Sequence, residues 1–353
     1  MLTRLFKQSL NFKCIASACT DSCCTGWGIP LDEATYEKLK NDPRFKKTMT
    51  EYTYINDYMT QPNINYAIID CKDNDRCPFL DTENLCDIQK SNGERGLSSV
   101  CALYPRYYNT VDGVYEESLS LACIEATEKL LLGSPLELIE IHRGPKRDVV
   151  MQTIITEDGK VLCSKDALHT FRHRVFDLIR DEAYTFEQKL EMLIAFHEHT
   201  QDMDEYKLKE ALVVYNFSNK EATSSIDNVL YKKLILFLKK VGKTDHDELD
   251  QLIDDCIGTS SYQSLHLQEL TKIDGIMSNY LIHQMFKDLY PCITHNNKMG
   301  SFQSLLVKVQ ILRLLIAFDG HFDNKRVARI IQMFSKGLEH HAVFHHEIGH
   351  VLL

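Results

Sequence analysis

The sequence FKCIASACTDSCCTGW, residues 12–27, sets the character of the N-terminal part of this chain, because four of its sixteen residues are cysteines. Five more cysteines follow before residue 124, so nine of the twelve in the 353-residue chain lie between Cys14 and Cys123. Thiols stay reduced in the cytosol, where a dense cysteine cluster indicates a metal site rather than a disulfide framework. We therefore expect a cysteine-ligated metal centre, and an iron-sulfur cluster in particular, in roughly the first 125 residues.

Eight of these nine thiols are the candidate metal ligands. Cys71 is set aside, because it lies in a polar loop just before Cys77. Adjacent cysteines point in different directions, so Cys23 and Cys24 can serve different parts of one cluster or two separate metals. Eight thiolates complete two tetrahedral zinc sites or exceed the needs of one four-iron cluster, and the spacing does not choose between these sites. The eight are Cys14, Cys19, Cys23, Cys24, Cys77, Cys86, Cys101 and Cys123.

Several common sites are excluded by the motifs that the sequence lacks. It has no C-x-x-C, which zinc ribbons and thioredoxins need, and no C-x-x-x-C-x-x-C, the usual radical S-adenosylmethionine signature. Neither G-x-G-x-x-G nor G-x-x-x-x-G-K-[ST] occurs, so a Rossmann cofactor site and a P-loop are disfavoured. We interpret the three remaining cysteines, Cys163, Cys256 and Cys292, as small buried hydrophobic residues of the helical part.

Composition and charge favour a cytoplasmic protein with two domains. The chain is 44% hydrophobic and 25% charged, an ordinary globular composition. Residues 1–10 lack the apolar core of a secretory signal, and the longest apolar run, residues 305–318, is too short and too charged to span a bilayer. The formal net charge of −10 argues against a nucleic-acid partner and suits a lysine-bearing protein partner better.

Local signals predict a mainly α fold. Residues 1–130 are expected to form a cysteine-rich metal-binding domain with short hairpins, residues 131–165 a linker with a possible hairpin, and residues 166–353 an α-helical domain. In the first domain, Asp32 is the expected N-cap of a helix reaching Lys40. Asp112-Gly113 predicts a hairpin turn within residues 107–121, and Asp158-Gly159 a second one.

Apolar periodicity predicts helices from about residue 164 onward. Asp323 is a plausible N-cap for the last of them, and Gly258 and Gly320 are stop signals after helical segments. The predicted helices cover residues 186–197, 226–241, 264–273, 278–289, 301–318 and 324–340.

Four residues near the cysteines are candidates for a role in the site. Trp27 can shield a metal from water, although it can equally be a core residue. Tyr104 is the second candidate for cofactor binding. Arg106, five residues after Cys101, can neutralise a thiolate cluster or a substrate carboxylate, or form a surface ion pair instead. Glu125 is the carboxylate nearest Cys123 in sequence and can orient a lysine amine or accept its proton, or simply begin a helix.

The C-terminus contains a formal H-E-x-x-H motif, His346-Glu347-Ile348-Gly349-His350. Two histidines four residues apart on one helical face can bind zinc and activate water. The motif is followed by only three residues, up to Leu353, and one terminal helical turn is a poor platform for catalysis. We therefore favour a solvated, histidine-rich terminus over a metalloprotease site.

The cysteine pattern resembles the opening of the flagellin lysine N-methylase family. It departs from the family pattern at Thr20, which replaces a glutamate, and at Ile124, which replaces a proline, and neither change removes a thiol. The segments that carry the resemblance are residues 12–27, Cys77-Pro78-Phe79-Leu80, Leu85-Cys86-Asp87-Ile88-Gln89, Cys101 with Tyr104-Pro105-Arg106, Glu117 to Cys123, Asn279-Tyr280-Leu281, Tyr290-Pro291 and Glu339-His340.

This resemblance implies methylation of flagellin lysine side chains by S-adenosylmethionine in the bacterial cytoplasm, with a [4Fe-4S] cluster held by the cysteines. The cysteine pattern is also similar to a broader zinc- or iron-chelating domain, so zinc is the alternative metal. A methylase without a Rossmann glycine loop must bind its methyl donor elsewhere, and a cluster with an open iron can chelate the donor's amino and carboxylate groups. The competing hypothesis is a metal-binding protein without methylase activity.

Overall fold

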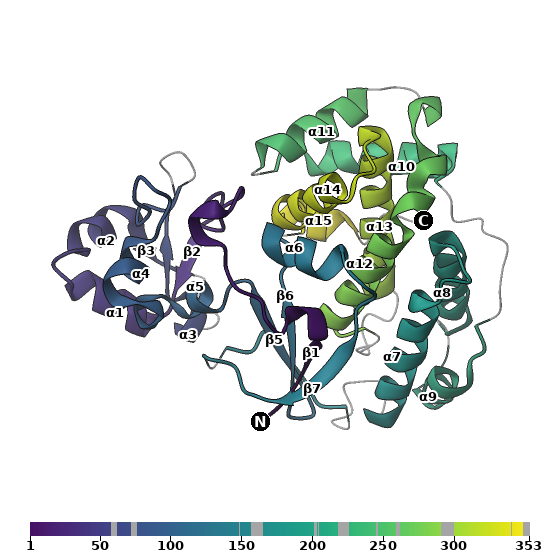
Figure 1. Ribbon diagram of the computed structural model, residues 1–353, viewed down its shortest axis with the longest axis horizontal. Helices are drawn as coiled ribbons and strands as arrows, with labels where there is room; N and C mark the ends of the chain where they lie inside the picture. Colours follow the sequence, from purple (N-terminus) through teal and green to yellow (C-terminus); the bar gives the residue numbers. More distant parts are fainter. Residues whose placement is uncertain are drawn as a thin grey trace.

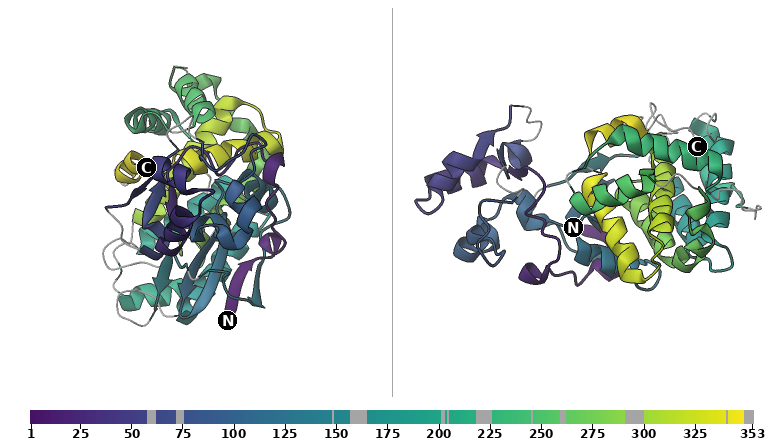
Figure 2. Two further views of the ribbon diagram at one scale, coloured as in Figure 1. Left: turned by 90° about the vertical axis from the view of Figure 1, so that its left-hand side faces the viewer. Right: turned by 90° about the horizontal axis from the view of Figure 1, so that it is seen from above.

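A computed structural model describes residues 1–57, 62–71, 76–147, 149–156, 165–200, 203, 205–217, 226–244, 246–258, 262–290, 300–339 and 341–348. Its described part is mainly helical, as the sequence predicts. A smaller lobe of short helices and strands lies beside a larger body, in which a sheet is covered by long helices (Figures 1 and 2). We call the smaller part, residues 14–103, the cysteine lobe.

The sheet of the body has five strands in the order β7-β1-β6-β5-β8. The first strand runs parallel to β6 and antiparallel to β7, while β5 pairs antiparallel with β6 and parallel with β8. The sheet therefore joins the start of the chain to segments more than 100 residues later. Its strands are β1 (Leu2–Phe6), β5 (Arg106–Val111), β6 (Val114–Leu119), β7 (Leu138–His142) and β8 (Gln152–Ile154).

The hairpin predicted at Asp112-Gly113 is confirmed as the turn between β5 and β6. Both turn residues have positive φ, 49° and 77°, a conformation that glycine adopts freely and aspartate tolerates. The segment 131–165, expected to be a linker, instead contributes β7 and β8 to the sheet. Its strands pair with β1 and β5 far away in the sequence, which no local signal reveals. The second predicted hairpin, at Asp158-Gly159, lies outside the described residues.

Hydrophobic packing divides the chain at other places than residue 130. Phe6, Leu119 and Leu130 are fully buried in one core together with the long helices. The cysteine lobe has a core of its own, which includes Ile29, Leu39 and Phe79. The N-terminal strand, the hairpin and the first helix after Cys123 therefore belong to the body, because they bury their apolar side chains there.

The lobe consists of a small antiparallel sheet, in the order β2-β4-β3, and short helices. Asp32 caps the first helix as predicted: its Oδ1 accepts a hydrogen bond from the Thr35 amide at 2.9 Å, and its Oδ2 accepts one from the Ser99 amide at 2.8 Å. One carboxylate thus begins α1 and ties it to α5. The elements are β2 (Ile29–Leu31), α1 (Glu33–Asn41), α2 (Lys46–Tyr52), β3 (Thr53–Ile55), α3 (Pro62–Asn65), β4 (Ala67–Ile69), α4 (Asp87–Asn92) and α5 (Ser99–Leu103).

Most predicted helices of the body are confirmed within a few residues. Asp323 caps α14 through the Arg326 amide at 3.0 Å, α11 ends at Gly258, and Gly320 follows α13 with φ of 72°. No helix among the described residues is long and apolar enough to cross a membrane. The helices are α6 (Ile124–Leu131), α7 (Lys165–Arg180), α8 (Phe186–Thr200), α9 (Glu205–Val214), α10 (Asn228–Val241), α11 (Asp247–Gly258), α12 (Asp274–Lys287), α13 (Gly300–Asp319), α14 (Asn324–Gly337) and α15 (Ala342–Ile348).

One helix prediction is wrong in type. Residues 264–273 were expected to form an α-helix, but Leu267–Ile273 forms a 3₁₀ helix. Leu267, Leu270 and Ile273 are spaced three residues apart, and a 3₁₀ helix places such residues on one face. All three pack against the core of the body, so burial explains the tighter turn.

Candidate functional site

Five thiols lie in the core of the cysteine lobe or pack against it. Cys71 and Cys77 are buried in this core, and Cys24, Cys86 and Cys101 pack against it. The backbone brings these distant segments together, since the Cys77 amide donates to the Cys24 carbonyl at 2.8 Å. Cys71 was set aside in the sequence, yet it lies among the candidate ligands, because strand β4 delivers it to the core.

A second group of thiols lies where the lobe meets the body. Cys123 precedes α6 and packs against the core of the body, while Cys19 is half-buried and Cys14 is exposed. The pKa of Cys123 is raised to about 11, chiefly by burial and also by the thiolates of Cys19 and Cys14, although these lie more than 100 residues away in sequence. Cys23 lies next to both groups, with its Sγ 4.0 Å from that of Cys24.

The thiols influence one another electrostatically. The pKa of Cys101 is raised to about 12, chiefly by burial and also by the neighbouring thiolates of Cys24, Cys86 and Cys71. The pKa of Cys24 is lowered, chiefly by its hydrogen bond with Cys23 and also by Ser22 and Lys336. Thiolates gathered in this way repel one another, so a bound cation would replace their protons favourably.

The chemistry of these donors fits a thiophilic metal or an iron-sulfur cluster. All eight candidate ligands are reduced thiols. Within the described residues, no three His, Cys, Asp or Glu side chains already stand in the arrangement of a metal site. The fold supplies thiol ligands in two groups, one at the core of the cysteine lobe and one where the lobe meets the body. Cys256, by contrast, is buried in the core of the body, as predicted, whereas Cys163 and Cys292 lie outside the described residues.

The two aromatic candidates both lie beside the cysteines. Trp27 is 38% exposed, and its Nε1 donates a hydrogen bond to the Cys23 carbonyl at 2.7 Å. Trp27 is therefore attached to the loop of residues 19–24, which we call the cysteine loop, and is not a core residue. Tyr104 is half-buried; burial raises its pKa well above the usual value, and the thiolates of Cys123 and Cys23 add to that shift.

Arg106 and Glu125 have different surroundings. The Arg106 Nε lies 3.5 Å from Oε1 of the buried Glu117, and its Nη2 donates to the Phe12 carbonyl at 3.2 Å. The guanidinium thus forms an ion pair within the sheet. Glu125 is half-buried in the first turn of α6, where the backbone amides of Glu125 and Ala126 hydrogen-bond the Cys123 thiol.

The C-terminal H-E-x-x-H motif is only partly described. His346 is exposed, and the Glu347 carboxylate lies 3.2 Å from Lys240 and 3.3 Å from His346 Nδ1. His350 lies outside the described residues.

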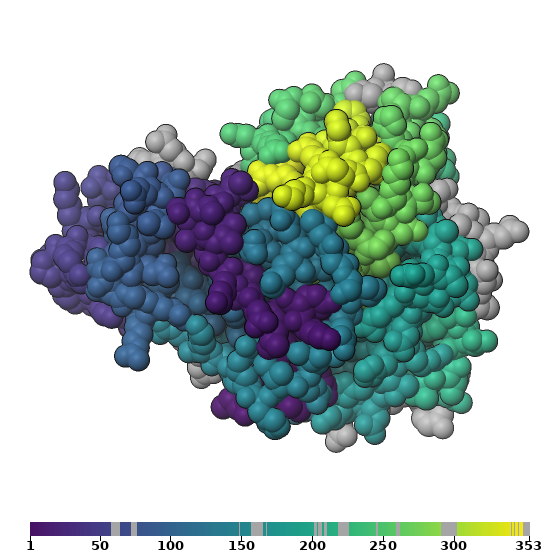
Figure 3. Space-filling view, viewed as in Figure 1, coloured from purple at the N-terminus to yellow at the C-terminus, as the bar shows by residue number. Residues whose placement is uncertain are grey.

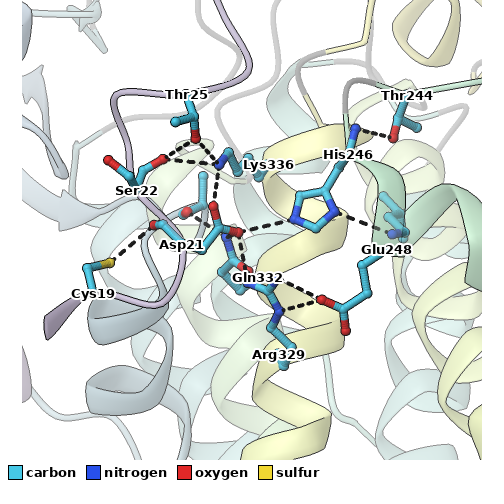
Figure 4. A network of polar contacts seen from close by, with 12 residues as sticks. Cys19, Asp21, Ser22, Thr25, Thr244, His246, Glu248, Arg329, Gln332 and Lys336 are labelled. Atoms are coloured by element: carbon cyan, nitrogen blue, oxygen red, sulfur yellow. Dashed lines mark hydrogen bonds and ion pairs between the residues drawn. The ribbon is translucent and has the colours of Figure 1, made fainter. Parts of the chain in front are cut away.

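A polar network that the sequence did not reveal joins the cysteine loop to the body (Figure 4). Its centre is Asp21, whose Oδ2 accepts hydrogen bonds from Arg329 Nη1 at 2.8 Å, Gln332 Nε2 at 3.0 Å and His246 Nε2 at 3.1 Å. Its Oδ1 accepts a hydrogen bond from Lys336 Nζ. Burial alone raises the pKa of Asp21, but hydrogen bonds from His246 and Lys336 outweigh it and hold this pKa well below its usual value.

The network also supplies the positive charge that was expected from Arg106. Lys336 lowers the pKa of Cys24 and partly offsets the raised pKa of Cys19. These contacts span more than 220 residues of sequence, so no local motif marks Lys336, Arg329 or Gln332. The one available signal was the charge pattern of residues 324–337, which carry four basic side chains and no acidic one.

The geometry therefore defines a thiol-rich protein, in which a lobe that carries reduced cysteines packs against a helical body. Residues 172–352, just over half of the chain, match the family model described as the FliB lysine N-methylase C-terminal domain. The chain belongs to the FliB lysine N-methylase family. This membership confirms the resemblance seen in the sequence, and with it the expected enzyme class of lysine methyltransferases.

Individual relatives agree with this assignment. The chain is 36% identical to the flagellar biosynthetic protein FliU of Salmonella muenchen over 123 residues, which are 34% of this chain and 72% of that protein. It is 34% and 36% identical over 127 residues to lysine-N-methylases of Salmonella choleraesuis (strain SC-B67) and Salmonella typhimurium (strain LT2). These matches cover 34% of this chain but only 30% of either enzyme. No solved structure matches the chain significantly.

Proposed function

We propose that this protein methylates lysine side chains of flagellin in the cytoplasm, with S-adenosylmethionine as the methyl donor and a [4Fe-4S] cluster bound by its cysteines. The match of residues 172–352 to a lysine N-methylase domain carries the methylation part of this proposal. The names of the relatives, a flagellar biosynthetic protein and lysine-N-methylases, support flagellin as the substrate.

Four thiolates suffice for a four-iron cluster, and the eight candidates exceed that number. Those around the lobe core, Cys24, Cys77, Cys86 and Cys101, come from segments that the backbone brings together. When bound, a cluster of this kind supplies iron coordination positions that suit amino and carboxylate groups. The other four thiols, at the junction with the body, are the alternative ligands or a second set.

The reaction needs a neutral lysine amine, because a protonated amine has no electron pair to donate. The amine nitrogen attacks the methyl carbon of the sulfonium, a C–N bond forms, and the S–C bond breaks with its electrons remaining on sulfur. The new ammonium group then gives its proton to a base. Glu125, half-buried beside Cys123, is our candidate for that base. The net charge of −10 favours the approach of a lysine-bearing protein.

The alternative function is a zinc- or iron-chelating protein without methylase activity, and the metal distinguishes the two. Anaerobically purified protein should be brown, with the broad visible absorbance of thiolate-ligated iron and with acid-labile sulfide. A colourless protein containing zinc would contradict the cluster.

Methylation is tested by incubating this protein with S-adenosylmethionine and flagellin, and by counting added methyl groups with mass spectrometry. The Cys77→Ala variant removes a thiol of the lobe core, and Cys256→Ala is its matched control, because Cys256 is buried in the other core. We expect methylated lysine with wild type and Cys256→Ala, and little with Cys77→Ala. No mass shift with wild type would contradict the methylase function.

A further inference from the structure

Helix α14 holds two cysteine-bearing segments at once. Gln332 Nε2 donates to Asp21 Oδ2 at 3.0 Å and also to the Ala122 carbonyl at 3.0 Å. Asp21 lies between Cys19 and Cys23, and Ala122 immediately precedes Cys123. One amide side chain therefore links the loop that carries Cys19, Cys23 and Cys24 to the segment that carries Cys123.

Further contacts fix the loop on the same helix. Lys336 Nζ bonds Asp21 Oδ1, the Ser22 carbonyl at 3.2 Å and Thr25 Oγ1 at 3.4 Å. The Cys19 thiol in turn donates to the Asp21 carbonyl at 3.1 Å. In Figure 3, the N-terminal stretch lies on the surface between the cysteine lobe and the C-terminal helices. Hydrogen bonds from polar side chains thus fix the loop at one position on α14.

The Asp21 carboxylate is only 8% exposed, and Lys336 is 16% exposed. Removing one partner from a nearly buried charged network leaves the other without compensation, which is costly. The loop is therefore expected to have one well-defined docked position and to leave it when the network is broken.

We propose that Asp21 and Gln332 are positioning residues, which dock the Cys19–Cys24 loop on α14 and so bring its thiols next to Cys123. The helical domain, which matches the family model, then holds together the thiols at the junction without supplying one itself. This inference rests on the proposed function, since it treats these thiols as metal ligands.

Two variants break the link with little change in shape. Asp21→Asn removes the charge that Lys336 and Arg329 neutralise. Gln332→Met removes the hydrogen bonds to Asp21 and to the Ala122 carbonyl, and also the one that Gln332 Oε1 accepts from Arg329 at 2.8 Å. Arg326→Gln is the matched control on the same helix, because Arg326 binds Asp319 and Glu248 instead. Circular dichroism of each full-length variant reports whether it is folded.

The first measurement is the alkylation rate of Cys19 and Cys123 in the metal-free, full-length protein, resolved by mass spectrometry. We expect Asp21→Asn and Gln332→Met to raise both alkylation rates at least about tenfold, because each variant removes a hydrogen bond to a charged group from the docked state. Arg326→Gln should leave both rates near those of wild type. Unchanged rates in the two test variants, or an equal increase in the control, would overturn the proposal.

The second measurement is the visible and electron paramagnetic resonance spectrum of the iron-loaded protein. We expect altered spectra in Asp21→Asn and Gln332→Met, and a wild-type spectrum in Arg326→Gln. Wild-type spectra in all three variants would overturn the role of docking in the metal centre. If wild-type protein binds no iron, the cluster is disproved, while the alkylation rates still decide whether Asp21 and Gln332 position the thiols.

Discussion

Replacing Glu116 by glutamine should destabilise the junction between the sheet and the helices more than any exposed substitution. Glu116 lies on β6 and is 1% exposed, and its partner Arg172 on α7 is 5% exposed. Arg172 Nη1 donates to the two carboxylate oxygens at 2.7 and 3.0 Å, and its Nε donates to the Tyr290 carbonyl at 3.0 Å. The pair therefore ties the sheet to α7 and to the end of α12.

Breaking a buried ion pair from one side costs about 3–5 kcal/mol, because the remaining charge loses its compensation. Glutamine keeps one oxygen acceptor for Arg172, so we expect the lower end, about 3 kcal/mol. That is a large part of the ~5–15 kcal/mol by which a typical domain is stable. Urea unfolding followed by circular dichroism measures this loss as a lower midpoint.

Glu137→Gln is the matched control. Glu137 pairs with Lys7 at 3.1 Å but is 59% exposed, so its loss should cost less than about 1 kcal/mol. If Glu116→Gln is no more destabilising than Glu137→Gln, the buried pair does not hold the sheet to the helices.

Three further predictions concern single buried or capping groups. His283 is fully buried, and burial lowers its pKa from 6.5 to about 4. The free energy of unfolding should therefore fall by up to ~3 kcal/mol as the pH drops from 6.5 to 4, because the unfolded state binds the proton first. Unfolding curves of His283→Gln, measured over this pH range, should lose that part of the pH dependence. Cys256→Ala should cost about 1 kcal/mol, from the cavity it leaves, and should not change the metal content measured by elemental analysis; a loss of metal would refute its structural role. Asp323→Ala should cost about 1 kcal/mol in thermal or urea unfolding by removing the cap of α14, and an unchanged stability would contradict the capping.

Features that depend on a few neighbouring residues could be predicted from the sequence. Asp32 and Asp323 cap their helices because an N-cap side chain bonds an amide three residues later. The turn at Asp112-Gly113 follows from the positive φ that these residue types accept. The helical nature of the C-terminal half follows from its apolar periodicity, and family membership from motifs around the cysteines.

Features that depend on distant partners could not be predicted. Thr3 pairs with Tyr115 on β6 and with Ile141 on β7, so part of the expected linker is a strand of the sheet. No local pattern encodes that register. Arg106 was a reasonable cation for the thiols by sequence distance, yet folding places it beside Glu117 and brings Lys336 to the cysteine loop instead. Cys71 was set aside for its polar sequence neighbours, although β4 delivers it to a buried position.

We propose above that this thiol-rich member of the FliB family transfers methyl groups to lysine. The most direct measurement uses anaerobically purified protein, flagellin and S-adenosylmethionine with a deuterated methyl group, followed by peptide mass spectrometry. We expect deuterated methyl groups on lysine side chains of flagellin, and none when the Cys77→Ala variant replaces the wild type. Wild-type protein that contains its metal and leaves every flagellin lysine unlabelled would disprove methylation by this protein.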